Sequence, residues 1–280
     1  MQQHSVVVLS YTGSPRRSPD GAYPFFVERF WKYKRKMIRF SHLLVVVSLF
    51  AVAWTVLGSH VQAANGTTAS NTTGNDISYP QCRTSNYPQT AFGIIGVTGG
   101  KAFTNNPCFA NEVAWASTLS HPVSLYMNLN APIGPTAFQG MTGPYGHCTI
   151  TDKLCQARNY GYNAAQHAFS YAASQRVSSS MWWMDIETAN SWSYSTLLNQ
   201  GTISGATQFF KRQQGIAVGV YSMPSMWRSI TGNYRNKLPV WIAASSASPA
   251  TFCTSKYGFT GGTVYIVQYA FSGFDSDYAC

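Results

Sequence analysis

Two carboxylates separated by one residue are the first feature of this 280-residue sequence that could do chemistry. Asp185 and Glu187 directly follow an apolar, tryptophan-rich run at residues 181–184. Residues i and i+2 of a β-strand point to the same face, about 7 Å apart along the chain. Two carboxyls held that close among aromatics have split pKa values, so that one stays protonated while the other ionises. Glycosidic bond cleavage requires this combination of acid and carboxylate.

Acidic residues are scarce after residue 63, where seven occur. Besides the pair above they are Asp76, Glu112, Asp152, Asp275 and Asp277. Four of the seven lie in or just beyond predicted strands, where a charge without a purpose is costly. The scarcity favours a functional role for the Asp185–Glu187 pair. The structural alternative is a pair that is merely solvated where its strand ends.

Seven short apolar runs alternate with segments long enough for helices, which predicts an α/β fold with a parallel sheet. The runs are continuous rather than alternating, as in strands buried on both faces. The predicted strands are residues 76–79, 92–98, 123–130, 181–187, 216–222, 239–243 and 264–269. The predicted helices are residues 111–119, 157–174 and 205–214. Connections after residue 243 leave little room for full helices.

Polar or acidic residues end nearly every predicted strand. In a parallel barrel the carboxyl ends of the strands converge on one mouth, where catalytic side chains lie. The pattern therefore predicts a barrel with a polar mouth. An open doubly wound sheet is the alternative, because it shows the same chemistry at one switch point.

The N-terminal part of the chain reads as an export signal. It holds eight of the 19 Lys and Arg residues, followed by an apolar run at residues 43–57. Fifteen residues are short for a membrane span, which needs about 20, but suit the core of a secretory signal. We interpret residues 1–36 as a disordered extension or a start codon placed too early. Residues 37–63 are interpreted as a signal peptide cleaved after Ala63, and residues 64–74 as a linker.

These assignments leave residues 75–280 as one barrel domain, secreted to the exterior or the cell wall. If the signal is not cleaved, it anchors the chain in a membrane. The net charge of +10 does not indicate nucleic-acid binding, because the basic residues of the body are scattered rather than clustered. We expect a monomer.

All six cysteines follow the predicted cleavage site, and an even number behind an export signal indicates disulfides. Neither the cysteines nor the six histidines show a metal-ligand spacing, so we expect no metal and no cofactor. A local bridge joins Cys148 to Cys155, which are seven residues apart. Cys82 and Cys108 follow neighbouring strands, whose mouth loops lie close together. This pairing leaves Cys253 with Cys280, unless one pair stays reduced.

At this point the sequence resembles a known family. The motifs that carry the likeness, in chain order, are residues 76–82 (DISYPQC), 183–187 (WMDIE), 239–243 (PVWIA), Gln268-Tyr269 and Asp275. They resemble the family-25 glycoside hydrolases, the Chalaropsis-type lysozymes, and more closely the cysteine-containing, glycoside-hydrolase-like secreted bacterial proteins. The resemblance implies a modified (β/α) TIM-type barrel with fewer than eight helices. It also implies cleavage of the β-1,4 bond after N-acetylmuramic acid in peptidoglycan.

The resemblance also implies roles for individual residues. Glu187 would be the general acid, and Asp185 would stabilise the oxocarbenium centre directly or orient the substrate acetamido group. Asp76 and Asp275 would line the same mouth. The run at residues 274–277 (FDSD) stands where the family usually has an aspartate–asparagine pair, which leaves open whether Asp275 or Asp277 faces the site. The three disulfides and the Gly/Pro-rich segment at residues 131–146 also depart from the family.

Two functions fit this pattern: a secreted glycosidase acting on peptidoglycan, and a non-catalytic wall protein that binds carbohydrate with a retained barrel. Either would use aromatic side chains, because sugar faces stack on them, although several aromatics will be core. The predicted substrate-binding residues are Asp76, Trp183, Tyr221, Trp241, Gln268, Tyr269 and Asp275. The predicted catalytic residues are Glu187 and Asp185.

Overall fold

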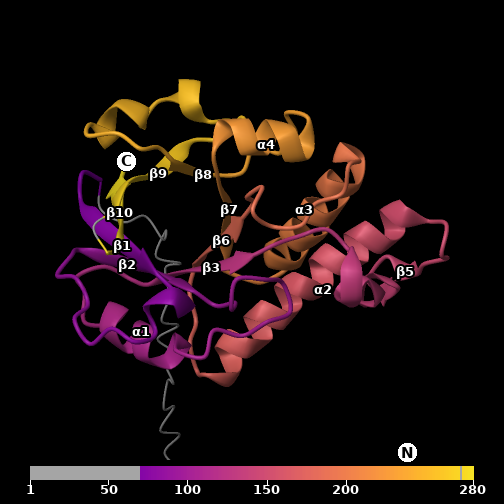
Figure 1. The fold of residues 1–280 in the computed structure, drawn as a ribbon, viewed down its shortest axis with the longest axis horizontal. Coiled ribbons are helices and arrows are strands. Elements are labelled where there is room, and N and C mark those ends of the chain that lie inside the picture. The colour runs from indigo at the N-terminus through magenta and orange to yellow at the C-terminus, as the bar shows by residue number, and fades with distance from the viewer. Residues whose placement is uncertain (1–69, 272) are drawn as a thin grey trace, which may run out of the picture. The chain divides into compact units, whose positions relative to one another are not determined.

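The computed structural model describes residues 70–271 and 273–280, in which eight strands close into a barrel. Helices lie on the outside of the barrel (Figure 1). The order of strands around it is β1-β10-β9-β8-β7-β6-β3-β2. Their bounds are β1 Thr73–Ile77, β2 Phe92–Gly96, β3 Ser124–Asn128, β6 Met181–Asp185, β7 Ala217–Ser222, β8 Val240–Ala243, β9 Val264–Phe271 and β10 Asp275–Ala279. The predicted barrel is confirmed, and the open sheet is excluded.

Seven strands run parallel, and the eighth closes the barrel in the opposite direction. β10 pairs antiparallel with both β9 and β1, whereas the other six neighbouring pairs are parallel. The sequence analysis predicted the seven parallel strands and missed β10. Gly273, with φ of 86°, lies in the short connection that reverses the chain between β9 and β10. A positive φ of this kind favours glycine.

Four α-helices and several short 3-10 turns connect the strands in the described chain. The helices are α1 Phe109–Ala116, α2 Lys153–Ser174, α3 Thr196–Lys211 and α4 Pro224–Thr231. The first three were predicted with shifted ends, whereas α4 was missed. After β8 the connection contains two 3-10 turns, Pro249–Phe252 and Ser255–Tyr257, as the short segments there predicted. The fold is thus a barrel with fewer than eight helices, in one domain.

The folded part of the chain begins earlier than expected, within the predicted linker. β1 starts at Thr73, inside the linker assigned to residues 64–74. The Asn71 N–H donates to the carbonyl of Ala279, and the Ala279 N–H donates to the carbonyl of Thr72. Pairing with β10, which the sequence did not reveal, therefore draws this segment into the sheet. The extension at residues 1–36 and the signal at 37–63 lie outside the described residues.

The two adjacent tryptophans of β6 lie on opposite faces of the barrel wall, because successive side chains of a β-strand point to opposite faces. Trp182 packs outward against Phe169 of α2 and Phe210 of α3, with ring centroids 5.9 and 5.0 Å apart. Trp183 points into the barrel, where its ring lies 5.9 Å from that of Trp241. Both tryptophans of β6 are only 1% exposed. The barrel interior beneath the mouth is thus filled with packed side chains rather than open.

α2 and α3 pack backbone to backbone and form the thickest part of the helical layer (Figure 1). A Cβ atom added to Gly161 would lie 1.8 Å from the carbonyl oxygen of Thr202. One added to Gly205 would lie 2.0 Å from the carbonyl oxygen of Arg158. Glycine is required at both positions because any side chain would force the helices apart. No helix in the described part of the chain is long and apolar enough to span a membrane.

Three disulfides cross-link the loops, and they join the cysteine pairs that the sequence predicted. Cys82–Cys108, Cys148–Cys155 and Cys253–Cys280 have Cα–Cα distances of 5.4, 5.7 and 5.3 Å. The second links the first turn of α2 to the hairpin formed by β4 Thr142–Gly143 and β5 Gly146–His147. The third fixes the end of the chain just after β10. The Cys280 N–H donates to the carbonyl of Tyr265 near the start of β9, so the third bridge lies at the end of the barrel opposite the mouth.

Candidate active site

A small polar cavity of about 120 Å³ lies at the carboxyl ends of the parallel strands. It is lined by Asp76, Tyr126, Asp185, Glu187, Tyr221, Trp241, Gln268 and Asp275. A wider pocket of about 450 Å³ shares four of these residues. Its remaining lining is Met223, Met226, Ala243, Ala244, Ser245 and Tyr269. The sequence-predicted site residues are therefore brought together here, with the exception of Trp183.

Asp185 and Glu187 are in contact at the end of β6. Asp185 is the last residue of the strand and is 5% exposed, whereas Glu187 lies two residues beyond it and is half-buried. The two carboxyls lie close enough for each to affect the pKa of the other. The second oxygen of Asp185 accepts a hydrogen bond from the Asn128 Nδ2 group of β3. The neighbouring Ile186 is fixed by donating its N–H to the carbonyl of Tyr221 at 2.9 Å.

The pKa values of both carboxyls are raised, and that of Asp185 is raised further. Burial raises the pKa of Asp185 well above its usual range, and the charges of Glu187 and Asp76 add to the effect. Burial also raises the pKa of Glu187, while the hydrogen bond from Asp185 opposes the rise. Burial therefore favours the neutral form of both carboxyls, and most strongly that of Asp185. Two carboxyls this close cannot both ionise without a large electrostatic cost.

A second pair of carboxyls, Asp76 and Asp277, lies across the β1–β10 seam. Asp277 is fully buried, accepts a hydrogen bond from Trp241 Nε1 at 2.8 Å and contacts Asp76. Burial, followed by the charge of Asp76, raises the pKa of Asp277 well above its usual range. Burial, followed by the charge of Asp275, raises the pKa of Asp76 to about 7. Burial therefore favours the neutral form of Asp277 more strongly than that of Asp76.

Asp275, rather than Asp277, faces the mouth. It is partly exposed and lines both the small cavity and the wider pocket. It is the register partner of Asp76 across the antiparallel pair of β1 and β10. Burial raises the pKa of Asp275. The structure thus answers the question that the sequence left open.

Tyr221 and Gln268 connect the two carboxyl pairs through a chain of hydrogen bonds. The Tyr221 hydroxyl donates to Gln268 Oε1 at 2.7 Å, and Gln268 Nε2 donates to Asp76 Oδ2 at 2.9 Å. Burial and the surrounding carboxylates raise the pKa of Tyr221, so that its hydroxyl stays protonated. The Tyr221 ring packs on that of Trp241, with centroids 4.4 Å apart. These contacts fix the floor of the cavity.

Trp183 is not positioned to bind a substrate, which corrects the sequence prediction. It lines neither pocket at the mouth and lies in the barrel interior with Phe92, Ile94 and Met181. Trp241 is equally buried, but one edge lines the small cavity. Tyr269 lines the wider pocket as predicted. The reason is that the barrel interior is layered, and Trp183 stands one layer below Asp185.

Asn128 and Tyr126 belong to the site, although the sequence analysis did not select them. Both lie on β3, two residues apart, and so share the face that points inward. Thr98 Oγ1 donates to Asn128 Oδ1 at 2.7 Å, which orients the amide nitrogen toward Asp185. Asn128 ends β3 and belongs to the polar run at the end of the predicted strand 123–130, which is the signal that could have identified it.

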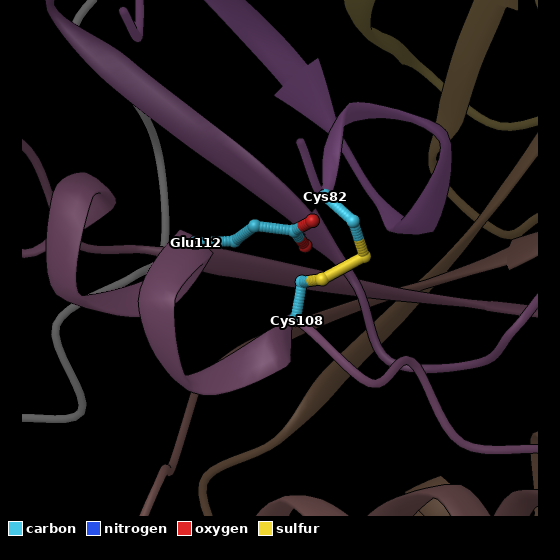
Figure 2. A group of neighbouring side chains, drawn as sticks. All are labelled: Cys82, Cys108 and Glu112. Carbon is cyan, nitrogen blue, oxygen red and sulfur yellow. A yellow bond between two sulfur atoms is a disulfide. The ribbon is translucent and has the colours of Figure 1, made fainter. Parts of the chain in front are cut away.

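The part of the chain that the structure describes shows one cluster of side chains with metal-ligand chemistry, and it lines neither pocket at the mouth. It consists of Cys82, Cys108 and Glu112 (Figure 2). The two sulfurs are bonded to each other, so neither is a thiolate, which is the form that ligates metals. Neither pocket at the mouth is lined by histidine or cysteine. The cluster therefore offers a single carboxylate and no ligand set.

Comparison with known proteins gives one family match, to a model described as Lysozyme-like protein 1. The match covers residues 147–256, which include β6 with Asp185 and Glu187. The likeness is to lysozymes. It agrees with the resemblance drawn from the sequence motifs. No curated protein matches the chain.

Solved structures of lysozymes are similar to the chain at low sequence identity. The muramidase from Trichobolus zukalii is 19% identical, with 75% of this chain and 93% of that chain covered and a TM-score of 0.48. A family GH25 lysozyme from Aspergillus fumigatus is 16% identical, with coverages of 75% and 94% and a TM-score of 0.48. The autolysin LytC from Streptococcus pneumoniae, in complex with a synthetic peptidoglycan ligand, is 13% identical, with coverages of 75% and 47% and a TM-score of 0.48.

Proposed function

We propose that the chain is a secreted glycoside hydrolase that cleaves β-1,4 bonds of peptidoglycan. The observation that carries the proposal is the contact between Asp185 and Glu187, both with raised pKa values, at the open end of the barrel. The match to a lysozyme-like family over the segment that contains both residues supports it. A wall polysaccharide is the substrate class that this likeness favours.

Glu187 serves as the general acid in the proposed mechanism. It lines both the small cavity and the wider pocket, so a glycosidic oxygen in the pocket lies within its reach. Burial raises its pKa, which favours the protonated form that a general acid requires. Protonation of the leaving oxygen breaks the C–O bond and leaves positive charge on the sugar ring.

Asp185 orients the substrate rather than balancing that charge directly. Its carboxyl is deeply buried and holds a proton in the free protein, so it is neutral where a charge stabiliser must be ionised. A neutral carboxyl can donate a hydrogen bond to an acetamido carbonyl, and Asn128 Nδ2 fixes its other oxygen. Asp275, which is more exposed, provides a carboxylate at the opposite wall of the cavity.

Export of the chain from the cytoplasm is the last part of the proposed function. Three disulfides suit an oxidising compartment outside the cytoplasm. We propose that the signal at residues 37–63 is removed and that the mature chain begins near Ala64. Mass spectrometry of secreted material that showed intact residues 1–63 would contradict this.

The decisive experiment is turbidity clearing of purified cell walls by the wild type and by Glu187→Gln. Loss of general acid catalysis lowers the rate by at least about 10²-fold, while the isosteric change leaves the fold intact. Asp152→Asn is the matched control, since it is an acid-to-amide change at the α2 N-cap, where Asn caps as well as Asp. It should clear walls like the wild type.

Two outcomes would overturn the assignment. Wild-type rates in Glu187→Gln would remove Glu187 from the mechanism. If the wild type bound walls in a pelleting assay without clearing them, the chain would be a carbohydrate-binding protein with a retained barrel.

A further inference from the structure

A second, larger cavity of about 620 Å³ lies on the helical side of the molecule and shares no lining residue with the mouth. Its walls come from the β4–β5 turn, α2, the C-terminal half of α3 and the loop after α4. The residues that carry the argument are Tyr145, Arg158, Gln208, Lys211, Arg212 and Asn236. Its volume falls in the range of about 300–1,000 Å³ typical of small-molecule sites.

The lining is basic. Three of its nine residues are cationic and none is Asp or Glu, although the whole sequence contains only 19 Lys and Arg. Lys211 and Arg212 lie at the C-terminal end of α3, where cations stabilise the helix dipole. Arg158 lies in the second turn of α2, near the opposite end of its helix, so the dipole does not explain its place. Three positive charges around one cavity repel one another, and an anion bound between them would relieve that repulsion.

Aromatic faces hold the two guanidinium groups. Arg158 lies over the Tyr145 ring at 5.8 Å from its centroid, and Arg212 lies over the Tyr162 ring at 5.6 Å. Stacking of this kind orients a guanidinium while leaving its N–H groups at the edge free to donate. The cavity therefore presents charged donors that are already positioned.

The neutral side chains of the cavity add further hydrogen-bond donors. The Tyr145 hydroxyl donates to Gln208 Oε1, which uses the acceptor of that amide and leaves its nitrogen as a donor. Asn236 Oδ1 accepts the N–H of Leu238 at 3.2 Å. Its Nδ2 group is buried and has no hydrogen-bond partner among the described residues. A buried amide nitrogen without an acceptor is costly and calls for one.

We propose that this cavity binds a phosphate group carried on a larger molecule, specifically a phosphodiester-linked polymer of the cell wall. The successive phosphates of such a polymer bring several non-bridging oxygens and one negative charge each to the two guanidiniums, the ammonium and the amide donors, and arginine is a preferred partner of phosphate. The volume exceeds that of an inorganic ion, so the phosphate is part of a chain. The cell-wall source rests on the proposed function, whereas the phosphate site does not.

Titration calorimetry on the Glu187→Gln protein tests the site without turnover. The probes are glycerol 3-phosphate and a poly(glycerol phosphate) chain, with citrate and polygalacturonate as carboxylate counterparts. We expect the phosphate probes to bind and the Arg158→Gln/Arg212→Gln double variant to bind them at least about 10-fold more weakly. Arg228→Gln, an exposed arginine of α4 that does not line the cavity, is the matched control and should bind normally.

The outcomes separate this inference from the catalytic one. Absence of phosphate binding, unchanged binding by the double variant with a native circular dichroism spectrum, or equal binding of polygalacturonate would each overturn the phosphate site. If the wild type fails to clear walls but binds poly(glycerol phosphate) through these arginines, the proposed function fails and the site stands. Wall pelleting that does not weaken after extraction of phosphate polymers would overturn the cell-wall source.

Discussion

Glu112 is a buried acid whose removal should make the protein more stable at neutral pH. It lies in the first turn of α1, beside the Cys82–Cys108 disulfide (Figure 2), and is fully buried. Asn106 Nδ2 donates to Glu112 Oε2 at 2.6 Å, whereas Oε1 has no partner among the described residues. Burial raises the pKa of Glu112 from 4.5 to about 7, against the opposing effect of Asn106.

The sign and size of the effect follow from proton linkage. Because the folded state binds the proton more tightly than the unfolded state, stability falls as the pH rises from about 4.5 to about 7. The difference of about 2.5 pKa units corresponds to roughly 3 kcal/mol. Glu112→Gln keeps the shape and the acceptor for Asn106 but cannot ionise. Its amide nitrogen replaces the unpartnered oxygen, which offsets about 1 kcal/mol of the gain.

Urea unfolding with intact disulfides, at pH 4, 5.5, 7 and 8, measures this difference. The variant should match the wild type or be slightly less stable at pH 4, and it should be more stable by roughly 1–3 kcal/mol above pH 7. Asp152→Asn is the control for the loss of one negative charge. A stability difference that is constant across this range, or an advantage of the variant that shrinks as the pH rises, would show that Glu112 ionises freely in the folded protein.

Two further changes test the packing and the charge state of the barrel. Gly161→Ala should destabilise the protein by about 1–3 kcal/mol in urea unfolding, because the added Cβ would clash with the Thr202 carbonyl. This change usually stabilises a helix, so a stabilised variant would contradict the close approach of α2 and α3. Asp277→Asn should shift the free energy of unfolding at pH 7 by less than about 1 kcal/mol. The reason is that an amide, like a neutral carboxyl, can accept from Trp241 and donate toward Asp76. A loss of stability above about 3 kcal/mol would show that Asp277 is ionised.

The parallel strands were predictable because burial on both faces leaves a continuous apolar run, and each of the seven runs became a strand. β10 was missed because its sequence, DSDYA, places acids where a strand normally has apolar side chains. α4 is no shorter than α1, which was predicted, but its sequence PSMWRSIT contains proline, two serines and a threonine, which are weaker helix formers. Its ends do carry signals, with Pro224 at the first position and Gly232 in the left-handed conformation just after it.

The pairing of Asp185 with Glu187 was predictable because it depends on spacing along one chain. Trp183 was assigned to the site as an aromatic on which a sugar could stack, and by the same period of two it does share the inward face with Asp185. A distance of about 7 Å along the strand separates them, enough to place one in the cavity and the other in the packed layer below. The sequence predicts the face of the strand on which a side chain lies. The depth of that side chain in the barrel depends on how neighbouring strands fill the interior.

The choice between Asp275 and Asp277 shows most clearly what the sequence lacked. Both stand on β10 two residues apart, and both face the barrel interior. On a parallel strand the later residue would lie nearer the mouth, which would favour Asp277. Because β10 runs antiparallel to β9 and β1, its first residue is at the mouth and its third lies beneath. The direction of a single strand therefore determines which acid can meet a substrate and which must stay neutral in the core.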